Sequence, residues 1–208
     1  MTGSLFETIR RIVQQELGQI RTAELAVVTE LHAHESESDS ANYACSVTLR
    51  DSGLALKQVP VATGLIGAVS IPAVGELVLV QFIGGDVNAP VITGRLYNDA
   101  DRPPVNAAGQ CVLHLPLGAG DADAVHVELR SGDARTLTLT LGSGLAIQLQ
   151  DDDPAVSIEV DGGKAKLSIA KDGAVTVESQ GDVSVKGNQV TIEAQGQLNL
   201  KGATVNLN

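Results

Sequence analysis

Hydrophobic and polar positions alternate with a period of two along most of the second half of the chain. The alternation is most regular near the C-terminal end, where five short segments read apolar–polar–apolar. These segments are Val175–Val177, Val183–Val185, Val190–Ile192, Leu198–Leu200 and Val205–Leu207. Successive side chains of a strand point to opposite faces of a sheet, so each segment predicts a short strand with one apolar face.

The tail also repeats. Its segments follow one another at alternating offsets of eight and seven residues, which gives a combined period of fifteen and brings Gly181 into register with Gly196. Strand–turn units with glycine at the corners are typical of a β-solenoid or β-prism. One short strand per step cannot bury its apolar face alone, and only 2% of the residues are aromatic. We therefore expect other copies of the chain to cover this face in an intertwined oligomeric rod.

The same alternation, with looser spacing, begins at Cys111. It continues through Leu113–Leu115, Val125–Leu129, Leu137–Leu141, Leu145–Leu149, Val156–Val160 and Leu167–Ile169. A β-sandwich would also produce this pattern, but it would need longer strands and hairpin turns that bring neighbouring strands together. Because the strands are short and the tail repeat is fixed, we favour the prism.

Residues 4–20 predict an amphipathic helix, and Ser4 followed by Glu7 fits a capping box at its start. The apolar stripe comprises Leu5, Phe6, Ile9, Ile12, Val13, Leu17 and Ile20. This stripe either packs on the β region that follows or docks on a partner, and the sequence favours neither.

A small β-barrel of the OB type, among other small barrels, is predicted over residues 22–97. Its candidate strands are Glu24–Leu31, Tyr43–Leu49, Leu56–Pro60, Glu76–Phe82 and Val91–Tyr97. Residues 98–110 predict a linker, because Pro103 and Pro104 cannot lie in a central strand. The expected organisation is therefore a helix over 1–21, a barrel over 22–97, a linker over 98–110 and a β-rod over 111–208.

The net charge of −11 argues against binding to nucleic acid or anionic membranes, which requires Lys and Arg. The two cysteines, Cys45 and Cys111, provide no disulfide framework. The N-terminus has no apolar signal-peptide core, and no stretch approaches the ~18 apolar residues of a membrane span. We expect the chain to be made in the cytoplasm.

Two histidine-containing groups are candidates for chemical sites. His32 and His34, with Glu35 and Glu37, have ligand types that suit a divalent ion, but a polar loop does not fix their geometry, so a solvated loop is preferred. Cys111 and His114 could pair as thiolate and imidazole, but they are three positions apart on a strand, which places them on opposite faces and argues strongly against a local dyad.

His114 or His126 could form a three-fold ring around an ion inside a trimer, although an outward or hydrogen-bonded histidine is the simpler interpretation. The acidic run 151–153 could bind calcium, although an exposed turn is simpler. No nucleophile-elbow, zinc-protease or P-loop motif is present. We therefore assign no catalytic residue, no metal ligand and no cofactor.

Residues 71–98 resemble the OB fold of phage baseplate assembly protein V and of VgrG-type spike proteins. The motif positions that match are Pro72, Val74, Gly75, Val78, Val80, Phe82, Gly85, Asp86, Pro90, Ile92, Gly94, Tyr97 and Asn98. These residues serve the scaffold: Gly75 fits a tight turn before a strand, Gly85 and Asp86 fit a hairpin-like turn, and Pro90 fits a strand start.

The resemblance implies the family's order of parts, namely a helix or arm, an OB barrel, a proline-rich link and a trimeric β-helix. It implies a homotrimeric central spike of a contractile injection machine, which joins a hub protein to the tip and contacts the target envelope transiently. The machine could be a phage tail, a type VI-like system or an extracellular contractile particle.

Two departures from the family refine this expectation. The linker of about a dozen residues leaves no room for the lysozyme-like domain that some members carry between barrel and spike. Only about twenty residues precede the barrel, which indicates the short phage-type form with a separate hub protein.

Some short phage spikes bind iron at the tip through a histidine motif, but this sequence has no histidine after His126. An unpaired last strand invites capping, and the resemblance implies a PAAR-type cone protein as the cap. The expected tip-protein contacts are Val205, Asn206, Leu207 and Asn208.

Two other functions compete with the spike. An OB barrel on a β-rod could be a module that binds nucleic acid or glycan, but the sequence lacks a basic, aromatic face. A cell-wall hydrolase is a further alternative, but no pair of carboxylates with a plausible pocket can be named. The structural spike is preferred to both.

Overall fold

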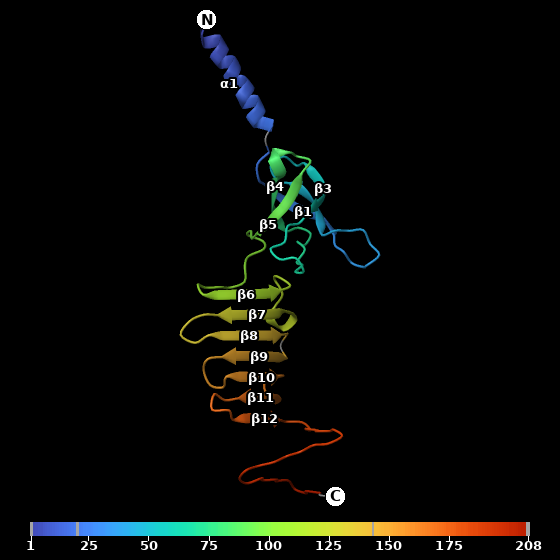
Figure 1. Cartoon of the computed structure of the whole chain (residues 1–208), viewed down its shortest axis with the longest axis vertical. Coiled ribbons are helices and arrows are strands. Elements are labelled where there is room, and N and C mark those ends of the chain that lie inside the picture. The colour runs from blue at the N-terminus through green and yellow to red at the C-terminus, as the bar shows by residue number, and fades with distance from the viewer. Residues whose placement is uncertain (1, 20, 143, 207–208) are drawn as a thin grey trace. The chain divides into compact units, whose positions relative to one another are not determined.

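The computed structural model describes residues 2–19, 21–142 and 144–206, and in its helix it describes the side chains of residues 5–16. The chain is mainly β, with one N-terminal helix followed by two antiparallel sheets (Figure 1). It divides into two compact units between Val105 and Asn106.

The predicted helix is confirmed as α1 (Thr2–Gln19). It begins two residues earlier than predicted, so Ser4 lies inside the helix and not at its N-cap. The predicted capping box of Ser4 with Glu7 is therefore wrong.

The apolar stripe of α1 is uncovered wherever its side chains are described. Every residue from Leu5 to Glu16 is exposed. The apolar members of this stretch, Leu5, Phe6, Ile9, Ile12 and Val13, are 48–69% exposed. Ile20 and the side chain of Leu17 lie outside the described residues. Of the two options for the stripe, packing on the described part of the same chain is not observed.

The first sheet has five strands, each within one residue of its predicted bounds. They are β1 (Glu24–His32), β2 (Ala44–Leu49), β3 (Ala55–Pro60), β4 (Leu77–Phe82) and β5 (Pro90–Leu96), with a short 3₁₀ turn η1 (Ile83–Gly85) between the last two. The pattern of apolar and polar residues predicts the strands well, although their burial differs: β2 is buried at five of its six positions, whereas β3 has one buried residue.

The strand order in this sheet is β3-β2-β1-β4-β5, and all the ladders are antiparallel. Val61, just after β3, forms a parallel bridge with Ile92 of β5. The amide of Ala62 donates to the carbonyl of Ile92 at 2.8 Å. The two outer strands of the sheet are therefore in contact at one point.

The core of the first unit lies on the inner face of this sheet. It consists of Ala26, Val28, Cys45, Val47, Leu49, Val59, Val78, Val80, Phe82 and Ile92. Phe82 is the one aromatic residue of this cluster, and Pro72 from the loop before β4 is fully buried as well. Eight of the ten members of the cluster are aliphatic: Ala, Val, Leu or Ile.

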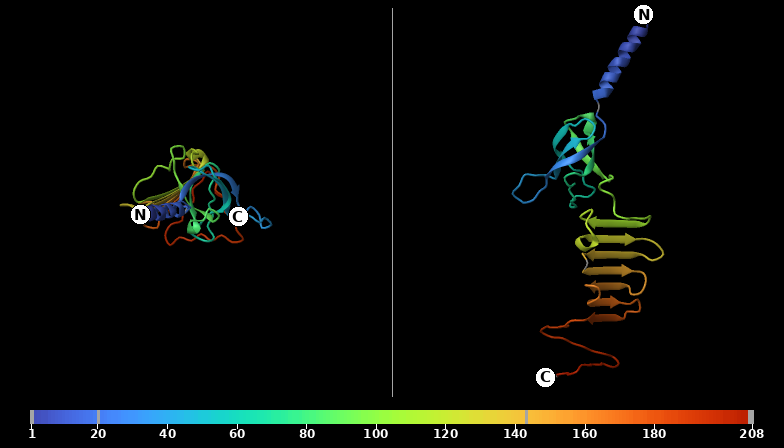
Figure 2. Two further views of the ribbon diagram at one scale, coloured as in Figure 1. Left: turned by 90° about the horizontal axis from the view of Figure 1, so that it is seen from above. Right: turned by 180° about the vertical axis from the view of Figure 1, so that it is seen from behind.

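The second sheet has seven strands in chain order. They are β6 (Gln110–Leu115), β7 (Val125–Arg130), β8 (Thr136–Leu141), β9 (Leu145–Gln150), β10 (Val156–Val160), β11 (Ala165–Ile169) and β12 (Val175–Ser179), with a 3₁₀ turn η2 (Asp121–Asp123) between β6 and β7. Each strand pairs antiparallel with its sequence neighbour, so the sheet is a meander (Figure 2).

This meander corrects the expectation of a solenoid with one strand per step. Hairpin turns were expected to accompany a sandwich, yet hairpins connect all seven strands here, and those strands form one sheet. Antiparallel neighbours need only a short link, and the Gly- and Asp-rich turns supply it. Gly142, after β8, has φ of +54°, and a Cβ there would lie 2.7 Å from the carbonyl oxygen of Ala122. Only glycine fits this close approach.

The end of the chain departs from the sequence prediction. Val175–Val177 lies in β12, but residues 180–206 contain no assigned strand. The predicted strands at Val183–Val185, Val190–Ile192 and Leu198–Leu200 are therefore absent from the single chain. A strand requires a neighbouring backbone for its hydrogen bonds, and the meander of this chain ends at Ser179.

Candidate functional site

One face of the second sheet is apolar along almost its whole length. Cross-strand partners lie on the same face, and the pairing register aligns them in three rows. The first row is Cys111, Leu129, Leu137, Leu149, Val156, Ile169 and Val175. The second is Leu113, Val127, Leu139, Ile147, Ile158, Leu167 and Val177. The third is Leu115, Val125, Leu141, Leu145, Val160, Ala165 and, at its end, Ser179.

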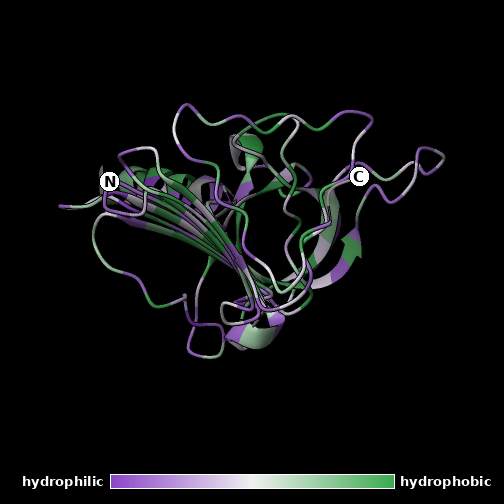
Figure 3. Cartoon of the chain, turned by 90° about the horizontal axis from the view of Figure 1, so that it is seen from below, coloured by the Kyte–Doolittle hydropathy of each residue, from purple (hydrophilic) through white to green (hydrophobic). Residues whose placement is uncertain are grey.

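The described part of the chain does not cover this apolar face. None of the residues in the three rows is buried, and Leu113 and Val177 are 50% and 64% exposed. Figure 3 looks down the stack of strands from below and shows apolar stretches, in green, recurring on successive strands. Soluble monomers rarely expose a continuous apolar surface of this extent, and such a surface usually marks an interaction site.

The opposite face of the same sheet is polar. One of its rows runs from His114 and His126 through Thr140 and Ala146 to an ion pair, in which Lys166 Nζ lies 2.6 Å from Glu159 Oε1. The hydrogen bond between these two side chains lowers the pKa of Glu159 and raises the pKa of Lys166. The two faces thus differ in chemistry: one is almost wholly apolar, and the other carries mainly polar and charged residues, with Val112 and Ala146 among them.

In the tail beyond β12, apolar and polar residues also alternate, and the apolar side chains are not covered by the described part of the chain. Residues 180–206 are exposed throughout. Val183, Val190 and Leu200, for example, are 65%, 51% and 59% exposed. Of the predicted tip contacts, Val205 is 49% exposed and Asn206 is exposed, while Leu207 and Asn208 lie outside the described residues.

Most motif residues of the first unit occupy turns and the core. Gly75 has φ of +93° in the turn before β4, and its amide donates to the carbonyl of Val28 at 2.9 Å. Gly85 has φ of +79°, and the carboxylate of Asp86 accepts from the amide of Asn88 at 2.9 Å. These last two residues shape the connection between β4 and β5.

The remaining motif residues divide between the β5 region and the surface. Pro90 is the first residue of β5, and Gly94 lies within that strand. The side-chain oxygen of Asn98 accepts from the amides of Ala100 and Asp101 at 2.7 and 2.8 Å, which closes the turn after β5. The exposed members, Val74 at 61% and Tyr97 at 60%, make no contribution to the core.

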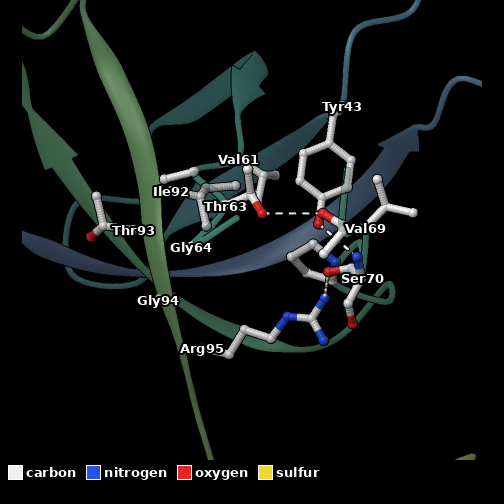
Figure 4. Close-up of a pocket in the computed structure, with 13 residues that line it drawn as sticks. Tyr43, Val61, Thr63, Gly64, Val69, Ser70, Ile92, Thr93, Gly94 and Arg95 are labelled. Carbon is white, nitrogen blue, oxygen red and sulfur yellow. Dashed lines mark hydrogen bonds between the residues drawn. The ribbon is translucent and has the colours of Figure 1, made fainter. Parts of the chain in front are cut away.

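A hollow of about 380 Å³ lies beside β5, and no sequence pattern predicts it (Figure 4). Tyr43 Oη accepts from the amide of Ser70 at 2.9 Å, and Arg95 donates to the carbonyl of Ser70. Arg95 Nε also lies 3.5 Å from Glu76. These contacts hold the loop of residues 61–72 in place beside β5. Tyr43 and Arg95 in the hollow are therefore already bonded to the backbone of this loop.

The polar loop after β1 is organised by Asp39. Its carboxylate accepts from the amides of Glu35, Ser36 and Ala41 at 2.6–2.9 Å and lies 2.8 Å from His34 Nδ1. The amide of Ser36, with His34 second, lowers the pKa of Asp39 to about 2. Sequence reasoning missed this role of Asp39, although an Asx-type turn is a known use of aspartate.

His32, the last residue of β1, and His34 in the loop have different partners. His32 Nε2 lies 2.8 Å from the hydroxyl of Ser46, whereas His34 pairs with Asp39. Among the residues that the structure describes, no group of three or more metal-binding side chains is found.

The other chemical candidates also separate or engage in local contacts. Cys111 lies on the apolar face of β6 and His114 on the polar face, as predicted. In the acidic run, Asp151 accepts from Arg135 Nε at 2.6 Å, and Asp153 accepts from the amide of Lys171 at 2.9 Å. The hydrogen bond from Arg135 lowers the pKa of Asp151. Two of these aspartates thus tie turns of the second sheet together.

Within the residues that the structure describes, no helix combines the length and the apolar character needed to cross a membrane.

Comparison with known proteins finds a family match within the first unit. Residues 49–97 match the family described as the type VI secretion system/phage-baseplate injector OB domain. The match runs from the last residue of β2 to the residue after β5. The protein therefore carries an OB domain of the kind found in baseplate injectors and VgrG spikes of contractile injection systems.

Individual relatives agree with the family match. A stretch of 38 residues is 45% identical to the actin cross-linking toxin VgrG1 of Vibrio cholerae serotype O1. Over the same length it is 42% identical to the type VI secretion system spike proteins VgrG2a and VgrG2b of Pseudomonas aeruginosa. Each match covers 18% of this chain and 4% of the relative. The similarity is thus confined to a short part of those long proteins.

Proposed function

We propose that this protein is the homotrimeric central spike of a contractile injection baseplate. In this proposal three chains join a hub protein to a tip protein, and the assembled rod is driven through a target envelope. Its role is mechanical and not enzymatic. The machine is a phage tail, a type VI-like system or an extracellular contractile particle.

The uncovered apolar face of the second sheet carries the proposal. Three rows on seven strands, made mainly of Leu, Ile and Val, are uncovered in the single chain. Three such sheets with their apolar faces turned inward would form a triangular β-prism with a polar exterior. Burial of this apolar surface, which contributes ~25 cal/mol of free energy per Å², would be the main contribution that stabilises such an assembly.

The tail supports the same arrangement. The apolar–polar–apolar segments recur throughout its fifteen-residue repeat. Residues 180–206 nevertheless form no strand in one chain. In the proposed trimer the tails wind around one another, so that each segment pairs with segments of the other two chains. The prism of 111–208 would then begin as three meanders and end as a triple-stranded β-helix.

The first unit would attach the spike to the hub. We propose that the five-stranded sheet closes into an OB barrel over 22–97, since Val61 already bridges Ile92 between its outer strands. The motif residues from Pro72 to Asn98 maintain this barrel and its turns. Helix α1 contributes an exposed apolar stripe for docking to the hub, and residues 98–110 act as the link to the prism.

At the other end, we propose that Val205, Asn206, Leu207 and Asn208 contact a PAAR-type cone protein. The last turn of an intertwined rod leaves strand edges without partners, and such edges favour capping. A chain that lacks residues 205–208 should keep its oligomeric state but lose binding to a purified cone protein.

The first test is the solution mass of the full chain beside a chain that ends at Arg102, measured by light scattering. The proposal predicts a trimer of 21.5 kDa chains for the full length and a monomer for the shorter chain. A full chain that stays monomeric at high concentration would refute the trimer. A trimer that survives removal of residues 103–208 would place the interface in the first unit instead.

A further inference from the structure

Two histidines on the polar face of the second sheet lie in direct contact. His114 of β6 and His126 of β7 are cross-strand partners, and both are half-buried. Their Nδ1 atoms are 3.2 Å apart, and the rings meet edge to face with centroids separated by 5.5 Å. The loop of residues 116–124 connects the two strands and brings the histidines together.

The hydrogen bonds of His114 determine which nitrogen carries its proton. Nε2 lies 2.9 Å from the carbonyl oxygen of Ala119, which can only accept, so Nε2–H donates. The Nδ1 atom of neutral His114 therefore presents a lone pair toward His126. Metal-binding histidines almost always donate their other N–H to a carbonyl or carboxylate in this way.

The spacing of the two nitrogens also suits a metal ion. Zinc binds histidine nitrogen at about 2.0–2.1 Å, so two nitrogens on one tetrahedral ion lie about 3.4 Å apart. The observed separation of 3.2 Å needs little adjustment. A neutral His126 must only move its proton from Nδ1 to Nε2, where water can accept the new hydrogen bond.

We propose that His114 and His126 form a binding site for a divalent transition-metal ion that favours imidazole, such as Zn²⁺ or Cu²⁺. The ion binds both Nδ1 atoms, and water completes its coordination. The pair faces away from the apolar rows, so the site stays accessible whether or not the chain forms the proposed trimer.

The ion would add a second link between β6 and β7, which are otherwise joined by their backbone hydrogen bonds. β6 is the edge of the seven-stranded sheet and pairs with β7 alone. It is also the first strand after the proline-containing segment, so any pull from the preceding residues enters the sheet through β6. A metal bridge between His114 and His126 would secure this edge.

The test is zinc titration of the full chain by calorimetry, with Zn²⁺ alone as the probe. We expect one ion per chain, with affinity reduced at least tenfold in His114→Gln and in His126→Gln. His34→Gln is the matched control, because it removes a histidine from the first unit and should leave the affinity unchanged. Circular dichroism verifies that each variant is folded.

A second measurement on the unmodified protein does not depend on variants. Copper bound to the full chain should show two nitrogen ligands by electron paramagnetic resonance, and zinc should shift the Nδ1 resonances of His114 and His126 in the nuclear magnetic resonance spectrum. Unchanged resonances at saturating zinc, or equal binding by the wild type and His126→Gln, would overturn the proposal.

Discussion

Ile147 and Gln148 are adjacent on β9, yet they lie on opposite faces of the second sheet. Ile147 lies in the middle apolar row, between Leu139 and Ile158. Gln148 lies in a polar row, between Thr138 and Ser157. This contrast allows the two faces to be tested with the same substitution.

We predict that Ile147→Glu dissociates the proposed trimer, whereas Gln148→Glu does not. A carboxylate in the apolar interface would be buried without a partner, which is strongly unfavourable. The same carboxylate on the polar face remains in water. Sedimentation velocity at matched concentrations measures both. Equal masses for the two variants would show that the apolar face is not the interface.

In the tail, we predict that Val190→Asp speeds unfolding of the assembled protein at least tenfold and that Thr191→Asp has little effect. Val190 occupies an apolar position of the repeat and Thr191 the polar position beside it. In the proposed trimer the interlocked tails must separate before the chains can unfold, so a defect there should appear in the unfolding rate. Denaturant-jump kinetics on the full chain provides the measurement, and identical rates for the two variants would contradict tail winding.

The pH response of the loop after β1 follows from Asp39. Its pKa is lowered from 3.8 to about 2, chiefly by the amide of Ser36. A lowered pKa means that the loop contacts are fully present above pH 3.8 and are lost as the pH falls through about 2. A carbon-detected titration should place the Asp39 midpoint near 2, and His34→Gln should raise it. A midpoint at the ordinary value would show that the carboxylate does not hold this loop.

For the core of the first unit, we predict that Ile92→Ala lowers the free energy of unfolding by about 2–5 kcal/mol. Ile92 is 1% exposed and also bridges the outer strands through its backbone. Val74→Ala is the control, because Val74 is 61% exposed and surface changes usually stay within about 0.5 kcal/mol. Urea denaturation measures the free energy of unfolding of both variants. Similar losses of this free energy would contradict the placement of Ile92 in the core and of Val74 at the surface.

The turn before β4 offers a test of the motif glycine. Gly75 has φ of +93°, and no atom lies within 4 Å of the position that a Cβ would occupy. Gly75→Ala should therefore cost about 1–2 kcal/mol through backbone strain alone. Gly64→Ala is matched to it, since Gly64 has equal space without the positive φ. Thermal denaturation should separate the two variants, and equal melting temperatures would exclude strain at Gly75.

Much of the fold could be predicted because alternation is a local property. Every strand of the first sheet lies within one residue of its expected bounds, and Pro90 begins β5 as expected from its missing N–H. The β-character of the region from Cys111 to Val177 follows from the same alternation. The family motif depends on glycine and proline at turns, which are also local.

Pairing between strands was harder to predict because it depends on contacts distant in sequence. Alternation does not distinguish a meander from a solenoid, so the hairpins of the second sheet were missed. The contact of His114 with His126 requires both the hairpin and its register. In the tail the local pattern predicts strands, but a strand also needs a partner, and the single chain offers none to Val183–Ile192.

The number of thiols that react with a reagent should report whether the protein is unfolded, folded or assembled, because the chain has two cysteines in different environments. Cys45 is fully buried in the core of the first unit, and burial raises the pKa of its thiol, which lowers its reactivity. Cys111 is exposed and begins an apolar row of the second sheet. A thiol reagent should therefore label two sites in the unfolded chain and one in the folded monomer. In the proposed trimer it should label neither, so one reaction reports folding and assembly separately.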